Sequence, residues 1–329
     1  MKVLVAGATG ALGTPAIKEL VRRGHEVYGL TRDRGKSGTI TALGARPVIG
    51  DVLEEASIEA AVQEAQPEAV IQLLNAIPKR GAFRPGDLDA TNVLRTEGTR
   101  NLLGAATRHG VKRYLVESMI FGYGYGDRGA APLEEDAPFG SHVDNTKMNQ
   151  ALDALQIMER MVLDTSDHPQ VEGIVLRLGL FYGPNVGSTD FVISMLRKHM
   201  MLLPGGGKGQ LSWIHIEDGA TAIADALEKA PAGSVFNVVD DEPASLAATT
   251  AEIARVLDLP GPKSIPVGLA KIATSYAAQM AQTNLRASNR HIKEELGWKP
   301  AYPTYREGAR TLVQTSRSGS KRTTRETVT

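Results

Sequence analysis

The feature that most constrains the fold is a run of glycines placed directly after an apolar segment at the start of the chain. In residues 2–6 (KVLVA) four apolar residues follow a lysine, and three glycines come next at the spacing G-x-x-G-x-x-G. Such glycines allow a tight turn and bring backbone N–H groups close to a pyrophosphate at the N-terminus of the next helix. An ordinary glycine-rich turn is the alternative, but the position between strand and helix favours dinucleotide binding. The predicted cofactor loop comprises Gly7, Thr9, Gly10, Ala11, Leu12 and Gly13.

The first 180 residues alternate between short apolar runs and helical stretches. This alternation predicts an α/β fold, a Rossmann-type doubly wound parallel sheet. After residue 183 the pattern loosens into a smaller, mostly helical C-terminal substrate cap. We expect a dinucleotide-binding domain at 1–183, to which 213–240 return, an interleaved cap at 184–314, and a disordered tail at 315–329. The expected strands are 2–6, 26–30, 45–49, 69–74, 113–117 and 173–178, and the expected helices are 14–23, 92–109, 148–164 and 191–201.

Charge and cysteine content narrow the class of protein. Lys plus Arg and Asp plus Glu both number 37, so the formal net charge is zero. This balance gives no general attraction to nucleic acid or to an anionic membrane, and neither partner is expected. Without Cys the chain has no disulfides or thiolate metal sites, and no metal is expected. The N-terminal apolar run is too short for a signal peptide, and no segment approaches the ~20 apolar residues of a spanning helix, so we expect a cytoplasmic protein.

The end of the second predicted strand bears on the choice between cofactors. An acidic residue there would accept a hydrogen bond from a ribose 2′-hydroxyl, whereas an Arg would meet a 2′-phosphate. The strand ends in Thr31, Arg32, Asp33 and Arg34. Basic charge dominates, so we expect NADPH, with Arg32 as the anchor and Thr31 assisting. Asp33 keeps NADH possible, and a solvated loop is the alternative reading.

Several further segments occur in a fixed order along nearly the whole chain. They are GDV at 50–52, LLNA at 73–76, NVLRTEGTRNLL at 92–103, RLGLFYGP at 177–184, WIHIEDGA at 213–220, FNVVDDEP at 236–243 and ELGWKP at 295–300. With GATGALG at 7–13, these segments resemble the short-chain dehydrogenase/reductase superfamily in its extended and atypical branches. The resemblance implies further cofactor contacts from Asp51, Val52, Leu74, Asn75, Ala76, Gly179 and Leu180.

The resemblance also exposes a departure from the family pattern. Members use a Tyr-x-x-x-Lys pair on one helix, with a Ser or Thr after the fifth strand, to polarise and protonate a carbonyl. The matching helix here carries Ala151 at the Tyr position and Leu155 at the Lys position. Lys147 lies two turns upstream, which is too far to replace the lysine. The normal acid is therefore predicted to be absent.

Three residues are candidates to replace the missing acid. Ser118 stands near the family's serine-rich strand end, and its alternative role is to cap the strand. Tyr123 and Tyr125 follow within FGYGY, where either tyrosine is a substitute donor. A flexible lid with aromatic contacts is the competing interpretation of this segment.

These observations favour the function of an NAD(P)H-dependent ketoreductase. Its substrate would be an aromatic or polyketide-like ketone of secondary metabolism, as in antibiotic (angucyclinone-type) pathways. A phenol group of such a ketone can itself deliver the proton to the carbonyl. Positioning of the substrate would then supply most of the rate. Apolar residues expected in the cap could contact such a ligand, and the alternative is that they form the core of the cap. They are Met195, Leu196, Met200, Met201, Leu202, Leu203, Ile272, Tyr276 and Met280. The alternatives are a non-catalytic NADP(H)-sensing regulator and a nucleotide-sugar epimerase or dehydratase. A monomer and a homodimer are both compatible with the sequence.

Overall fold

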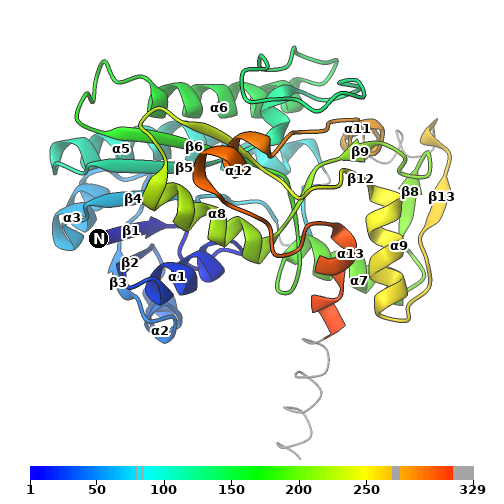
Figure 1. Cartoon of the computed structure of the whole chain (residues 1–329), viewed down its shortest axis with the longest axis horizontal. Helices are drawn as coiled ribbons and strands as arrows, with labels where there is room; N and C mark the ends of the chain where they lie inside the picture. The colour runs from blue at the N-terminus through cyan, green and yellow to red at the C-terminus, as the bar shows by residue number, and fades with distance from the viewer. Residues whose placement is uncertain (79, 83, 269–274, 314–329) are drawn as a thin grey trace, which may run out of the picture.

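The computed structural model describes residues 1–78, 80–82, 84–268 and 275–313 (Figure 1). Its centre is a seven-stranded sheet in the order β11-β6-β5-β4-β1-β2-β3, and every pair of neighbours is parallel. The strands are β1 (Lys2–Ala6), β2 (Glu26–Thr31), β3 (Arg46–Ile49), β4 (Ala69–Gln72), β5 (Arg113–Met119), β6 (Glu172–Leu178) and β11 (Val235–Val238). The predicted Rossmann-type fold is confirmed. Residues 315–329, predicted to be a disordered tail, lie outside the described residues.

Helices cover both faces of the sheet, because buried parallel strands need apolar cover on each side (Figure 1). One face packs against α3 (Glu55–Ala65), α5 (Thr99–Arg108) and α6 (Thr146–Leu163). The other face packs against α1 (Gly13–Arg22), α2 (Ser37–Ala42) and α8 (Ile216–Lys229). Two apolar cores result, one on each side of the sheet.

The helix predicted at 92–109 is not a single regular helix. It consists of α4 (Asp89–Val93), a π-helical turn η3 (Leu94–Gly98) and α5. One extra residue per turn in η3 rotates the side chains that follow it, and such turns are frequent at functional sites. Arg95 lies in this turn and is only 6% exposed.

The C-terminal elements gather at the end of the molecule away from the N-terminus (Figure 1). The predicted helix 191–201 is observed four residues earlier, as α7 (Gly187–Arg197). The segment SWIHIEDGA, expected to be a strand that enters a helix, contains the short strand β10 (Trp213–His215). Other short strands that the sequence did not indicate join this region, so it is less helical than expected. The elements of this region are β7 (Leu180–Tyr182), β8 (Leu202–Pro204), β9 (Gln210–Leu211), β10 (Trp213–His215), β12 (Ala244–Ser245), α9 (Leu246–Val256), β13 (Lys263–Ile265), α11 (Ser275–Gln282) and α13 (Tyr305–Ala309). Helix α12 (Arg290–Leu296) instead packs against β11 and α8. The proposed domain boundaries stay predictions.

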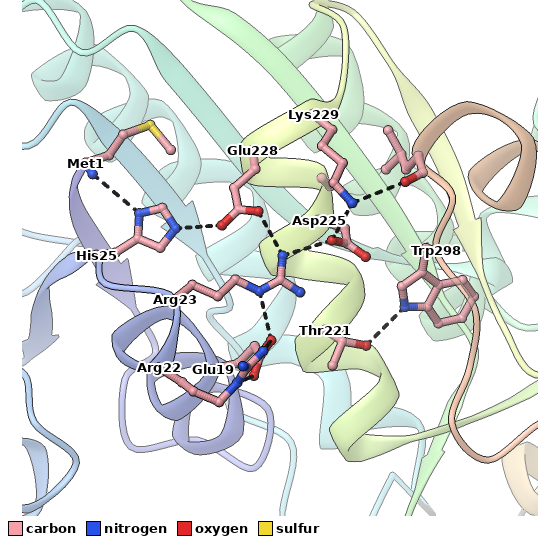
Figure 2. A network of polar contacts seen from close by, with 12 residues as sticks. Met1, Glu19, Arg22, Arg23, His25, Thr221, Asp225, Glu228, Lys229 and Trp298 are labelled. Atoms are coloured by element: carbon pink, nitrogen blue, oxygen red, sulfur yellow. Dashed lines mark hydrogen bonds and ion pairs between the residues drawn. The ribbon is translucent and has the colours of Figure 1, made fainter.

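A polar network joins α1 to α8 across more than 200 residues of sequence (Figure 2). The Arg23 guanidinium donates to Glu19 at 2.8 Å, to Asp225 at 2.8 Å and to Glu228 at 2.9 Å. His25 lies 2.9 Å from a second oxygen of Glu228. The hydrogen bond from Arg22 is the main cause that lowers the pKa of Glu19 to about 2, and Arg23 adds to it. These charges therefore hold together two of the helices that cover this face of the sheet.

No helix in the described part of the chain is long and apolar enough to cross a membrane.

Candidate cofactor and active site

The glycine loop after β1 has the shape of a phosphate cradle. Gly7 adopts φ +92°, and a Cβ there would lie 2.3 Å from the Leu73 carbonyl oxygen. A Cβ on Gly13 would lie 2.1 Å from the Gly7 carbonyl oxygen, so both positions require glycine. The Gly10 N–H closes the turn on the Gly7 oxygen at 2.9 Å. The backbone can thus approach a ligand with no side chain in between.

The rest of the loop is open to a ligand. Gly10 and Ala11 are exposed, Thr9 is partly buried, and Leu12 turns into the core at the N-cap of α1. The first turn of α1 carries no acidic residue, so its positive dipole end is unopposed. The loop therefore fits the pyrophosphate of a dinucleotide.

The ends of β2 and β3 lie side by side and bring the predicted adenosine contacts together. Thr31 is 8% exposed, and its hydroxyl oxygen accepts from the Asp33 N–H at 3.2 Å. The Arg32 side chain is 74% exposed, and Nη1 lies 3.9 Å from Asp51 Oδ2. Val52 is buried, with its carbonyl bound by Asn101 at 2.9 Å.

The Asp33 carboxylate is engaged in local structure. It accepts the Gly35 N–H at 2.9 Å and thereby caps the short 3-10 helix η1 (Arg34–Lys36). Arg32 is free of such a close contact within the described residues, which leaves basic charge available at this end of the site.

The remaining predicted cofactor contacts lie at the ends of β4 and β6. Asn75 and Ala76 are exposed, Leu74 is partly buried, and the Ala76 N–H donates to Thr91 at 3.0 Å. Gly179 is packed against β10, because a Cβ there would lie 2.8 Å from the Ser212 carbonyl oxygen. Leu180 begins β7 and is partly buried. Their contacts with a cofactor stay predictions.

Helix α6 buries apolar side chains at the two positions where the family pattern has Tyr and Lys. Ala151 is 1% exposed and Leu155 is 2% exposed, and both belong to the core between α6 and the sheet. Lys147 points elsewhere, since its Nζ lies 2.8 Å from the Asp89 carboxylate. Neither a phenol nor an ammonium group is supplied from this part of α6.

Ser118 is bound to a buried ion pair. Its hydroxyl donates to Glu159 Oε1 at 2.5 Å, and the side chain is fully buried. Arg177 donates from Nη2 to Glu159 Oε2 at 2.7 Å and from Nη1 to the Glu135 carbonyl at 3.0 Å. The hydrogen bond to Glu159 joins Ser118 of β5 to α6. The catalytic role of Ser118 stays a prediction.

The two candidate tyrosines differ in what their hydroxyl groups contact. Tyr123 is 1% exposed, and its hydroxyl donates to Asn237 Oδ1 at 2.7 Å. The Arg177 guanidinium lies over the Tyr123 ring, 4.9 Å from its centroid. Tyr125 stacks on Phe121 with 5.4 Å between ring centroids, and burial raises its pKa to about 12 against the opposing field of Arg95. Tyr123 is thus the more tightly held of the two.

Sequence reasoning missed Glu117. It lies in β5, and its Oε2 is buried with no hydrogen-bond partner among the residues that the structure describes. Burial raises the pKa of this carboxyl to about 7, while the charge of Arg95 opposes the rise. The signal was visible, because a charged residue inside an otherwise apolar parallel strand is unusual.

The apolar residues expected to line the cap are distributed between its core and its surface. Leu196 and Leu203 are buried, and Leu196 packs with Ile253, whereas Met200 and Leu202 are 56% and 48% exposed. Met195, Met201 and Met280 are partly buried. Ile272 and the Tyr276 side chain lie outside the described residues.

Comparison with known proteins decides the family. Residues 3–239 match the NAD dependent epimerase/dehydratase family. The chain belongs to this family. The match covers the glycine loop, the strands of the main sheet, and α6, and an NAD(P) cofactor is typical of this family. The expected resemblance is thereby confirmed at the level of the extended family.

Members similar to this chain include reductases. A 3-diazoavenalumate denitrifying reductase of Streptomyces sp is 34% identical over 311 residues, 94% of this chain and 99% of that protein. A 2-alkyl-3-oxoalkanoate reductase of Stenotrophomonas maltophilia is 27% identical over 74% of this chain and 72% of its own. The fold also resembles the UDP-glucose 4-epimerase of Thermotoga maritima, with a TM-score of 0.80 at 18% identity, over 97% of this chain and 99% of that chain.

Proposed function

We propose that this protein is an NADPH-dependent reductase of an aromatic or polyketide-like small molecule, whose proton does not come from a Tyr-Lys pair. The observation that carries the proposal is the combination of an intact glycine cradle with buried Ala151 and Leu155 on α6. The bound nicotinamide would supply a hydride. The protein's own contribution would be to hold a flat acceptor beside it.

The first candidate acceptor is the carbonyl group of a hydroxyaryl ketone. A phenol hydrogen-bonded to that carbonyl polarises it, which reduces the need for an acid from α6. The absence of the family's Tyr-Lys pair at Ala151 and Leu155 also disfavours an epimerase or dehydratase, which would rely on that tyrosine as its base.

A second acceptor class is favoured by the similarity to the Streptomyces denitrifying reductase. When a hydride replaces the N₂ group of an aryl diazonium ion, the products are the arene and N₂. No proton is consumed, so this reaction requires no acid at all. The two acceptor classes share one requirement, an aromatic ring held beside the cofactor.

NADPH oxidation with hydroxyaryl ketones, their O-methyl ethers and aryl diazonium salts tests the proposal. We expect turnover with at least one class and none with a non-aromatic sugar nucleotide. Turnover of free phenols alone would mean that the substrate delivers the proton, whereas turnover of the ethers as well would mean that the protein does. If NADPH binds but no acceptor is reduced, the reductase proposal is wrong and the sensing regulator becomes the better hypothesis.

The preference for NADPH is a separate prediction. Arg32 is exposed at the end of β2 and Asp33 is engaged in capping, so a 2′-phosphate would meet a cation here. We expect Arg32→Ala to raise KM for NADPH about tenfold or more and to leave KM for NADH unchanged. Arg22→Ala, at the far end of α1 and 69% exposed, is the matched control and should change neither value. Equal KM changes for both cofactors would contradict the prediction.

A further inference from the structure

Glu117 occupies the half of the sheet where the second nucleotide of a dinucleotide binds. In the strand order β3-β2-β1-β4-β5-β6, one mononucleotide lies over each half. Thr31, Arg32 and Asp51 mark the β1-β2-β3 half as the adenosine side. The β4-β5-β6 half is therefore left for the nicotinamide, and Glu117 lies on its middle strand.

The strand register places Glu117 at the carboxyl edge, level with the glycine cradle. Ala6, Gln72 and Val116 pair across β1, β4 and β5. One residue further along each strand are Gly7, Leu73 and Glu117. Two strand spacings separate the first and last of these, which corresponds to roughly 10 Å between their Cα atoms. This distance is short enough for one bound dinucleotide to reach from the glycine cradle to Glu117.

Side chains alternate along β5, so Glu117 lies on the sheet face opposite Ser118. Ser118 belongs to the Glu159–Arg177 ion pair on its own face. Leu176 of β6 pairs with Glu117 and adds no charge. The charged group whose field reaches Glu117 is Arg95 of η3, and this same field reaches the phenol of Tyr125.

The other acids and hydroxyl groups near this edge are less suited to proton transfer. Ser118 donates to Glu159 and Tyr123 donates to Asn237. Burial raises the pKa of the Tyr125 phenol to about 12, far above the working pH, but that of the Glu117 carboxyl only to about 7. A donor is most effective when its pKa lies near the working pH. Glu117 also keeps a buried oxygen without a partner in the described structure, and the residue as a whole is not fully enclosed.

We propose that the Glu117 carboxyl group donates the proton that completes carbonyl reduction, with Arg95 as a positioning residue. The inference rests on the proposed reductase function. The carbonyl carbon receives the hydride, the C=O π electron pair moves to oxygen, and that oxygen takes the proton from Glu117. The O–H bond of Glu117 breaks, and the resulting carboxylate is stabilised by the charge of Arg95 until water returns a proton.

The first test requires neither substrate nor turnover. Difference infrared spectra between the wild type and Glu117→Gln, recorded from pH 5 to 9, should show a protonated-carboxyl C=O band that disappears with a midpoint near pH 7. Glu64→Gln, an exposed glutamate on α3, is the matched control and should give no such band. A Glu117 carboxyl that is already ionised at pH 5 would overturn the proposal.

The second test is kinetic. We expect Glu117→Gln to lower kcat about 100-fold or more for a hydroxyaryl ketone and for its methyl ether, with KM and NADPH affinity within about twofold. The wild-type kcat should fall as pH rises above 7, and this decline should vanish in the variant. Glu117→Asp, which keeps an acid, should retain more activity than the Gln variant. A Gln variant within threefold of the wild type, or turnover of free phenols alone, would overturn the proposal.

The two proposals fail in different ways. A wild type that binds NADPH but reduces no acceptor refutes the reductase function itself, and the assignment of Glu117 as donor falls with it. A wild type that reduces ketones while Glu117→Gln does so equally well refutes only the role of Glu117. Glu64→Gln is the control for the kinetic test, because this exposed glutamate on α3 lies outside the site, and it should reduce ketones at the wild-type rate.

Discussion

Replacing Glu159 with alanine is expected to destabilise the protein by about 3–5 kcal/mol. Glu159 is 2% exposed and is the counter-ion of Arg177, which is 6% exposed. The Arg177 side chain is held between the rings of Tyr123 and Phe139, 4.9 and 5.0 Å from their centroids, so it cannot turn toward water. The variant would therefore contain a buried charge without its partner. Urea unfolding followed by circular dichroism measures the difference.

Two further variants separate this effect from a general loss of charge. Glu252→Ala removes the partner of Arg255, whose side chain is 65% exposed, and should cost only about 0.5 kcal/mol. The double variant Glu159→Leu/Arg177→Met should be more stable than Glu159→Ala, because no uncompensated charge remains. A cost below about 1 kcal/mol for Glu159→Ala would mean that water reaches Arg177.

Substituting Gly7 with alanine is expected to weaken both cofactor binding and the fold. The new Cβ would lie 2.3 Å from the Leu73 carbonyl oxygen, at a backbone φ of +92°. Relief requires β1 and β4 to move apart beside the cradle. We expect a loss of about 3 kcal/mol in stability and about 100-fold in NADPH affinity.

Gly24→Ala is the matched control for Gly7→Ala. Gly24 also has a positive φ, +84°, but a Cβ there meets nothing within 4 Å. It should cost about 1 kcal/mol and leave NADPH affinity unchanged. Fluorescence titration with NADPH measures affinity, and chemical unfolding measures stability. Equal binding by the two variants would show that the close approach to Leu73 is not essential.

The main sheet was predictable from sequence because its signals are local. The apolar run KVLVA gives β1 with the expected bounds, and the glycines after it require a turn. The short strands β9 and β12, with two residues each, were not predictable, since two residues show no period. The π turn at 94–98 was also missed, because its extra residue leaves the apolar pattern of the helix almost unchanged.

The chemistry of the site depends on contacts that are remote in sequence. Ser118 and Tyr123 were reasonable donors until their partners were known, and these partners lie 41 and 114 residues away. The polar edge of the cofactor site was easier to foresee, because Thr31, Arg32 and Asp33 adjoin one strand end. Glu117 carries a visible signal, a charge directly after the apolar run 114–116 of β5, but its proximity to Arg95 follows only from the fold.

The polar network between α1 and α8 has a consequence for the order in which parts of the protein can fold during synthesis. The glycine loop and α1 are synthesised before α8, yet α1 packs against this helix, which ends at Lys229, and the edge of β6 is completed by Val235–Val238. Until synthesis has passed Lys229, α1 can pack on β1 and β2 but lacks its contact with α8. The nascent chain therefore presents the glycine loop well before the helices beside it can take their final arrangement.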